Sequence, residues 1–149
     1  PGLILYGLEP SQKIPLWEDI RPVLSWKTKV LQVKQFQPGY RIGYGGTYRT
    51  RGNETIAHLP VGYPHGFRRP PTTWKYVLIH GQKAPIVGRV SMEKCAVNVS
   101  HIKDVRTGDE VVLLGQQGDE HISAEMIATW LDTINYEVVT MIMPRVSRR

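Results

Sequence analysis

Cysteine is nearly absent from this 149-residue chain, in which Cys95 is the single example. A lone cysteine excludes a disulfide within the chain and agrees with a reducing compartment. The five histidines are scattered, and no spacing among them resembles a zinc site, so we expect no bound metal. Long apolar runs are also missing. No segment approaches the roughly 18–20 residues that span a bilayer, so we expect no membrane partner.

The composition is that of one globular domain. Hydrophobic residues make up 41% of the chain and charged residues 21%, which excludes a disordered polymer. The net charge of +6 favours anionic partners, among them nucleic acids, phosphorylated cofactors and carboxylate substrates. Part of this charge comes from Arg145, Arg148 and Arg149, which we interpret as a solvated cluster.

The first twenty residues differ in pattern from the rest. Residues 1–7 form a short apolar run that contains glycines, which predicts a buried strand, and chains rarely begin inside one. We therefore expect residues 1–8 to be a piece of a preceding domain. Residues 9–20 are rich in turn formers such as Pro10 and Pro15, so they are predicted to be a linker. Residues 21–149 are predicted to be one domain.

Most of the remaining sequence predicts short strands. Residues 23–34 alternate apolar and polar side chains, and the alternation slips at Val30-Leu31, which indicates either a bulge or a strand that changes its surroundings. Short strands separated by glycines and prolines are typical of a barrel or a sandwich. The further predicted strands are residues 55–61, 76–79, 85–87, 96–99, 110–114 and 136–143.

One predicted helix interrupts these strands. Ser123 can act as its N-cap, and Glu125 places a negative charge in the first turn, where it suits the helix dipole. An apolar face follows, as expected for a helix that packs against a core. Its members are Met126, Ile127, Trp130 and Leu131.

Two loops combine glycine with tyrosine. In residues 43–48, Gly-Tyr-Gly-Gly-Thr-Tyr, the glycines would let backbone amides approach a phosphate, but no helix follows and no Walker lysine completes the motif. The alternative for this segment is a tight turn that carries a packed tyrosine. Near Tyr63, glycines and the pair Arg68-Arg69 form either an anion site or a solvated basic loop.

Several segments, in order and correctly spaced, resemble those of alanine racemases. The resemblance covers essentially the whole chain, and it implies a mostly β fold: the Greek-key-like C-terminal β-barrel domain of that family, with one short helix. Residues 1–8 would be the last strand of an N-terminal α/β barrel that is otherwise absent from the chain. The matching segments are residues 43–48, 59–63, 85–93, 108–115, 133–138 and 144–148.

The resemblance also implies an activity. Family members are cytoplasmic homodimers that use pyridoxal 5'-phosphate to interconvert L- and D-alanine, and D-alanine serves the peptidoglycan of the bacterial cell wall. The C-terminal domain of one subunit covers the cofactor in the barrel of the other, so the expected partners are alanine and the barrels of both subunits. A lysine and a tyrosine serve as the two bases. The lysine lies in the barrel, so this chain alone is predicted to be inactive.

The site residues of the family match positions of this chain. Tyr44 is the catalytic tyrosine that acts across the subunit interface. Because free tyrosine titrates near ~10, such a base is tuned by nearby cations or donors, which in the family lie mainly in the barrel. The other matches are Tyr63 and Met92 near the substrate in the same trans position, Arg69, Arg89 and Ile142 along the entrance corridor, and Gly2 and Leu3, whose backbone amides would hold the cofactor phosphate.

Four positions depart from the family pattern. Ser91 stands where many relatives have cysteine, Glu93 where many have aspartate, His65 in place of a usual aspartate, and Pro144 where some have a tyrosine. His65 and Glu93 motivate an alternative, a racemase of broader, serine-type specificity. A non-catalytic basic β-barrel that binds nucleic acid is another alternative, drawn from the four Trp and seven Tyr, although the main interpretation includes no nucleic-acid partner. A third is a regulatory protein that keeps the domain without its chemistry.

Overall fold

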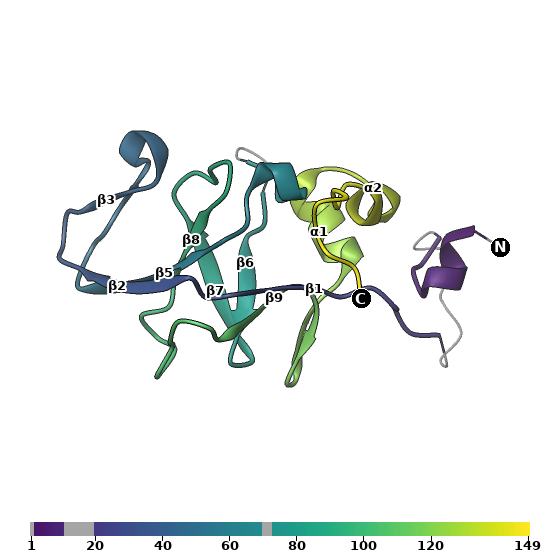
Figure 1. Cartoon of the computed structure of the whole chain (residues 1–149), viewed down its shortest axis with the longest axis horizontal. Helices are drawn as coiled ribbons and strands as arrows, with labels where there is room; N and C mark the ends of the chain where they lie inside the picture. The colour runs from purple at the N-terminus through teal and green to yellow at the C-terminus, as the bar shows by residue number, and fades with distance from the viewer. Residues whose placement is uncertain (1, 11–19, 70–72) are drawn as a thin grey trace.

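The computed structural model describes residues 2–10, 20–69 and 73–149 of the chain. Antiparallel strands dominate it, and the two α-helices lie beyond one end of the sheet (Figure 1). The strands are β1 Trp26–Lys29, β2 Gln32–Phe36, β3 Arg41–Ile42, β4 Tyr48–Arg49, β5 Glu54–Leu59, β6 Tyr76–Ile79, β7 Gln82–Val87, β8 Cys95–Asn98, β9 Glu110–Gln117 and β10 Glu120–Ile122. The helices are α1 Ala124–Leu131 and α2 Asn135–Thr140, and the 3-10 turns are η1 Gly2–Tyr6, η2 Tyr44–Gly46 and η3 Tyr63–His65.

The predicted change of surroundings at Val30-Leu31 is confirmed, and it closes the sheet into a barrel. In the described chain the strands follow the order β1-β9-β6-β7-β8-β5-β2, and β10 pairs with β9. The two outer strands, β1 and β2, are consecutive in sequence. The Val30 N–H donates to the Asp109 carbonyl at 2.9 Å, next to β9, whereas the Leu31 N–H donates to the His58 carbonyl of β5 at 2.8 Å. The chain thus passes from one edge of the sheet to the other at these two residues.

The core fills the space between the sheet and the helices. Trp74 and Phe67 are fully buried, and their rings stack with centroids 4.5 Å apart. Trp26 meets both rings edge-on. The Trp74 indole N–H donates to the Leu113 carbonyl at 2.8 Å, so this large ring is buried with its polar atom satisfied. A smaller cluster joins the β3–β4 hairpin to β5, β7 and β8, and it consists of Ile42, Ile56, Val87 and Ala96.

The predicted strands at residues 55–61, 76–79, 85–87, 96–99 and 110–114 are confirmed by β5, β6, β7, β8 and β9. The helix is confirmed too, since the Ser123 hydroxyl accepts the Met126 N–H at 3.2 Å and Ile127 and Leu131 are buried.

The prediction of a strand at residues 136–143 is wrong, and so is the prediction of a single helix. Residues Asn135–Thr140 form α2, which packs against α1. The buried residues of α2, Asn135 and Val138, lie three residues apart, which is the spacing of one helical face. The β-branched residues of this segment favoured the prediction of a strand, but the spacing of its buried residues is that of a helix.

The prediction of a strand at residues 1–8 is also wrong for the residues described. Gly2–Tyr6 form the 3-10 turn η1, in which the Gly7 N–H donates to the Ile4 carbonyl at 3.0 Å. Gly2 and Gly7 have φ values of 58° and 73°, which are incompatible with an extended strand. The apolar run reflects the burial of Leu3 and Leu8, while Leu5 is exposed. Within the predicted linker, residues 11–19 lie outside the described residues.

Candidate functional site

Tyr44 lies on a tight glycine turn that presents its ring to solvent. The turn η2 connects β3 to β4, and Tyr44 is 67% exposed. Gly43 has a φ of 77°, and a Cβ at this position would lie 2.9 Å from the backbone nitrogen of Arg89. A side chain is therefore excluded at Gly43, both by the left-handed backbone and by the close approach. The turn is held against the Gly88-Arg89 bend with its tyrosine pointing outward.

The hairpin that carries Tyr44 is anchored by the carboxylate of Glu54. The Tyr48 hydroxyl donates to Glu54 Oε2 at 2.7 Å, and the Asn98 side-chain amide donates to the same oxygen at 2.9 Å. The Arg51 N–H donates to Oε1 at 2.8 Å. Burial acts to raise the pKa of Glu54, but the hydrogen bonds from Arg51 and Tyr48 outweigh it and hold this pKa below its ordinary value. The buried carboxylate thus ties β4 to β5 and β8.

This anchor predicts an acid-dependent loss of stability. The pKa of Glu54 is lowered in the folded state, so its contribution to stability is present above the unfolded-state pKa and is lost as the pH falls through the folded-state value. Glu54→Gln should lower stability at neutral pH by about 1 kcal/mol and make stability less dependent on acid. Urea unfolding at neutral and acidic pH measures both effects. Glu110→Gln, on an exposed ion pair with Lys27, is the matched control, and equal pH profiles for both variants would contradict the prediction.

Tyr63 and Met92 meet at a second close backbone contact. The Tyr63 N–H donates to the Ser91 carbonyl at 3.3 Å, which joins η3 to the loop between β7 and β8. Tyr63 is 42% exposed and Met92 55% exposed, so both side chains point outward. A Cβ at Gly62 would lie 2.2 Å from the carbonyl oxygens of both Ser91 and Met92. Only glycine allows η3 and this loop to approach so closely.

Gly62→Ala is therefore expected to push these two segments apart. The added methyl group meets backbone rather than a flexible side chain, so the backbone must move to relieve the clash. We expect the free energy of unfolding to fall by about 2–3 kcal/mol. Gly52→Ala is the control, because a Cβ at Gly52 meets nothing within 4 Å. Thermal or urea unfolding of the two variants measures the difference, and equal stabilities would contradict the close contact.

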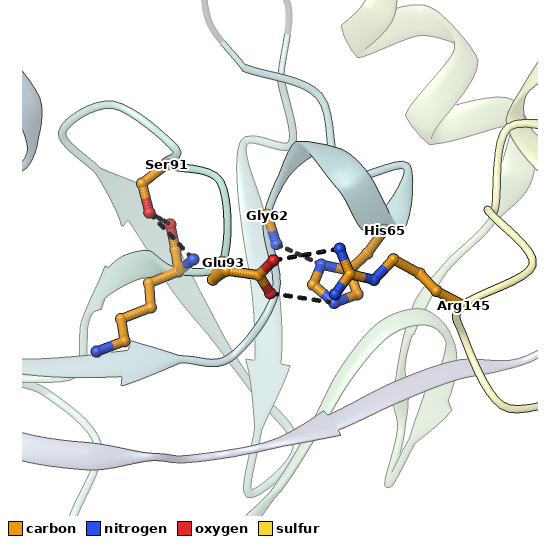
Figure 2. Close-up of polar contacts among 6 residues, drawn as sticks. Gly62, His65, Ser91, Glu93 and Arg145 are labelled. Atoms are coloured by element: carbon orange, nitrogen blue, oxygen red, sulfur yellow. Dashed lines mark hydrogen bonds and ion pairs between the residues drawn. The ribbon is translucent and has the colours of Figure 1, made fainter.

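A charged cluster connects the Tyr63 turn, the Met92 loop and the segment after α2 (Figure 2). His65 Nδ1 accepts the Gly62 N–H at 3.2 Å, and His65 Nε2 lies 3.7 Å from Glu93 Oε2. The Arg145 guanidinium donates to the other Glu93 oxygen at 3.2 Å. In Figure 2 the Glu93 carboxylate points between the imidazole and the guanidinium. Two of the four departures from the family pattern, His65 and Glu93, are thus in contact with each other.

A cavity of about 290 Å³ lies beside Tyr44. Two cationic side chains line it, Arg89 and Lys94, together with His58, whose Nδ1 is buried and has no hydrogen-bond partner among the described residues. Burial lowers the pKa of His58, and the charges of Lys34 and Lys94 act in the same direction, so this imidazole is neutral. The cavity can therefore accept an anionic or hydrogen-bonding group next to the tyrosine.

The structure brings some of the predicted site residues together and keeps others apart. Tyr44 and Arg89 line one cavity, and Tyr63 contacts the Ser91-Met92 loop. Arg69 is exposed and does not line that cavity, and Ile142 is 6% exposed within the main core. Gly2 and Leu3, in η1, lie at the opposite end of the molecule from η2 (Figure 1).

Sequence reasoning missed His58, Lys94 and Glu54. The last two give weak signals, since Lys94 directly follows a motif segment and Glu54 is an acid at the start of an apolar strand. Neither signal shows that the residue faces Tyr44 or its hairpin. Within residues 2–10, 20–69 and 73–149, no three potential ligands are grouped to hold a metal ion. None of the helices in those ranges is long and apolar enough to cross a membrane.

Known proteins share both the sequence and the fold. The family model for the alanine racemase C-terminal domain matches residues 23–149. An alanine racemase from Halothermothrix orenii is 50% identical over 148 residues, and one from Desulfovibrio desulfuricans is 44% identical over 147; each match covers 99% of this chain. The chain spans 39% of the length of each of these relatives.

Solved structures agree. An alanine racemase from E. faecalis superimposes with a TM-score of 0.90 at 36% identity, covering 97% of this chain and 38% of that one. The alanine racemase of Bacillus anthracis with bound L-Ala-P gives a TM-score of 0.90 at 42% identity, covering 97% of this chain and 37% of that one. The matched family model and the shared fold together show that the chain belongs to the alanine racemase C-terminal domain family.

Proposed function

We propose that this chain is the C-terminal part of a longer, pyridoxal-phosphate-dependent alanine racemase, in which Tyr44 is one of the two bases. The observation that carries the proposal is the setting of Tyr44. Its ring is exposed on a turn that glycine and the Glu54 anchor hold rigidly, and it stands beside a cavity with two cations. No hydrogen bond to its hydroxyl is found in the described ranges, so the group is available to a substrate.

The residues of this chain fit one part of the proposed cofactor. Gly2 and Leu3 begin η1, where backbone N–H groups have no acceptor within the turn and can bind a phosphate. A Cβ at Gly2 would meet nothing within 4 Å, so the backbone there is open to a ligand. Pyridoxal phosphate, when bound, acts as an electron sink that acidifies the substrate Cα–H.

Tyr44 would move the proton on one face of the substrate through its hydroxyl oxygen. A phenol accepts a proton only as its phenolate, and positive charge nearby stabilises that form. Arg89 lies next to the turn that carries Tyr44: its guanidinium is 3.3 Å from where a Cβ on Gly45 would stand, and both residues line the same cavity. Tyr63 and Met92, exposed on the adjoining segments, would close around the substrate and exclude water.

The geometry supports a site shared between two subunits. The turn η1, which contains Gly2, and the β3–β4 hairpin, which carries Tyr44, lie at opposite ends of the molecule in Figure 1, so one subunit would bind the cofactor phosphate and its partner would supply the tyrosine. The exposed Tyr63 and Met92 would be covered by the partner's barrel. We therefore propose a cytoplasmic homodimer that supplies D-alanine for the peptidoglycan cell wall, with alanine and both barrels as its partners.

The proposal is tested by comparing this chain alone with the full-length protein. The 149-residue chain is expected to show no alanine racemisation, since the lysine that serves the other face lies outside it. The full-length protein is expected to racemise alanine in both directions and to show the absorbance of bound pyridoxal phosphate. Racemisation by the chain alone, or its absence from the full-length protein loaded with cofactor, would contradict the proposal.

A serine-type racemase is the second candidate, and the contact between His65 and Glu93 favours it. By the resemblance these residues replace two aspartates usual in the family; His65 lies two residues after Tyr63, and Glu93 directly follows Met92. A change in the residues next to Tyr63 and Met92 can change the space that these two side chains leave for the side chain of the substrate. Turnover of both enantiomers of alanine, serine and lysine by the full-length protein separates the candidates.

A further inference from the structure

His65 contacts three segments: the turn that begins at Gly62, the loop that carries Glu93, and the segment after α2. Its Nδ1 accepts the Gly62 N–H, and its own N–H donates to the Gly62 carbonyl at 3.0 Å. Its carbonyl accepts the Met143 N–H at 3.3 Å, from the segment after α2. Its Nε2 faces Glu93, the residue next to Met92, at 3.7 Å. The side chain of His65 is only 17% exposed, so its ring is packed among these contacts.

These contacts require a particular protonation state of the ring. An imidazole nitrogen that accepts a hydrogen bond carries no proton. Because Nδ1 accepts the Gly62 N–H, the neutral ring must carry its proton on Nε2, which is the nitrogen that faces the Glu93 carboxylate. A second proton on Nδ1 would turn this nitrogen into a donor and remove the acceptor of the Gly62 N–H.

The charges around the ring come from the two other segments. Glu93, on the β7–β8 loop, faces Nε2, and Arg145, after α2, holds the far oxygen of Glu93 at 3.2 Å. Arg145 thus supplies Glu93 with a cation that does not depend on His65.

We propose that neutral His65 is a positioning residue for the racemase site. Its Nδ1 accepts the Gly62 N–H and its Nε2–H faces Glu93, so His65 fixes the spacing between Tyr63 and Met92. The kinetic part of this inference rests on the proposed function. Loss of the Nδ1 acceptor would release Gly62, so the Tyr63 turn would loosen and the affinity for the amino-acid substrate would fall. His65 acts through Tyr63 and Met92 rather than on the reacting atoms.

Two conservative variants separate the two sides of the ring. Asparagine places an acceptor near the position of Nδ1 and lacks the group at Nε2, whereas glutamine reaches the position of Nε2 and lacks the one at Nδ1. In the full-length protein, His65→Ala and His65→Gln should raise the KM for alanine about tenfold with little change in kcat, as expected for loss of one buried hydrogen bond. His65→Asn should restore KM. His121→Asn is the matched control, because His121 is exposed on β10.

Amide hydrogen exchange keeps the inference testable whatever the enzyme's activity. Exchange of residues 62–66 in the full-length protein should be faster in His65→Ala and His65→Gln, and normal in His65→Asn. If a full-length protein without racemase activity shows this exchange pattern, the proposed function is contradicted, whereas the positioning role of His65 is supported. If all three His65 variants show the same exchange and the same KM as the unmodified protein, the positioning role of His65 is contradicted and the racemase proposal is unaffected.

Discussion

Tyr44→Phe is expected to lower alanine racemisation by the full-length protein roughly 10²–10⁴-fold, the usual contribution of a general acid–base group. The change removes one oxygen and keeps the ring, so the turn between β3 and β4 should keep its shape. The Tyr44 hydroxyl has no partner in the described part of the chain, so no structural hydrogen bond is lost. We expect kcat to fall in both directions, since a racemase passes through both bases in each, while KM and cofactor absorbance stay close to those of the unmodified protein.

Tyr40→Phe is the matched control for this variant. Tyr40 lies just before β3 at the base of the same hairpin, is exposed, and packs its ring against Phe36 at 5.0 Å between centroids. Loss of its hydroxyl should leave the rate unchanged. Equal rates for Tyr44→Phe and Tyr40→Phe would show that the Tyr44 hydroxyl takes no part in proton transfer.

Trp74→Ala is expected to have the largest effect on stability, a loss of about 3–5 kcal/mol. The indole is 1% exposed, stacks on Phe67 and meets Trp26 edge-on, so its removal leaves a cavity at the centre of the core. Its N–H also satisfies the Leu113 carbonyl in β9. Because the domain as a whole holds only a small net stability, this one change removes a large fraction of it.

Trp74→Phe separates the two contributions. Phenylalanine keeps an aromatic ring against Phe67 and Trp26 but leaves the Leu113 carbonyl unpaired, so we expect a loss of about 1–3 kcal/mol. Urea unfolding followed by far-UV circular dichroism measures both variants without relying on tryptophan fluorescence. A cost below about 1 kcal/mol for Trp74→Ala would contradict the central place of this ring in the core.

The strands that the sequence predicted well are those whose burial follows a simple pattern. Residues 76–79 and 111–114 are continuous apolar runs that become β6 and the buried part of β9. The slip at Val30-Leu31 even marked the point where the barrel closes. Residues 2–6 and 136–143 were predicted wrongly because short apolar runs suit a strand or a helical turn equally well. Tertiary contacts decide between them, as the burial of Asn135 and Val138 on one face of α2 shows.

The site was predicted through motifs and not through geometry. The resemblance picked out Tyr44, Tyr63 and Met92, and the structure places all three on exposed turns at glycine contacts, although their catalytic and binding roles stay predictions. The Glu54 anchor joins residues far apart in the chain, from Tyr48 to Asn98. No periodicity in one sequence could reveal such a contact, because it depends on the register of β5 and β8.

Cα hydrogen exchange tests the role of Tyr44 most directly. The full-length protein and its Tyr44→Phe variant would be incubated with each enantiomer of alanine in deuterated water, and deuterium at Cα would be followed by mass spectrometry or NMR. We predict that the variant binds cofactor normally, loses exchange mainly from L-alanine, and keeps exchange from D-alanine through the other base. Wild-type exchange from both enantiomers in the variant, or no racemisation by the unmodified protein, would contradict the assignment of Tyr44 as the base on one face of the substrate.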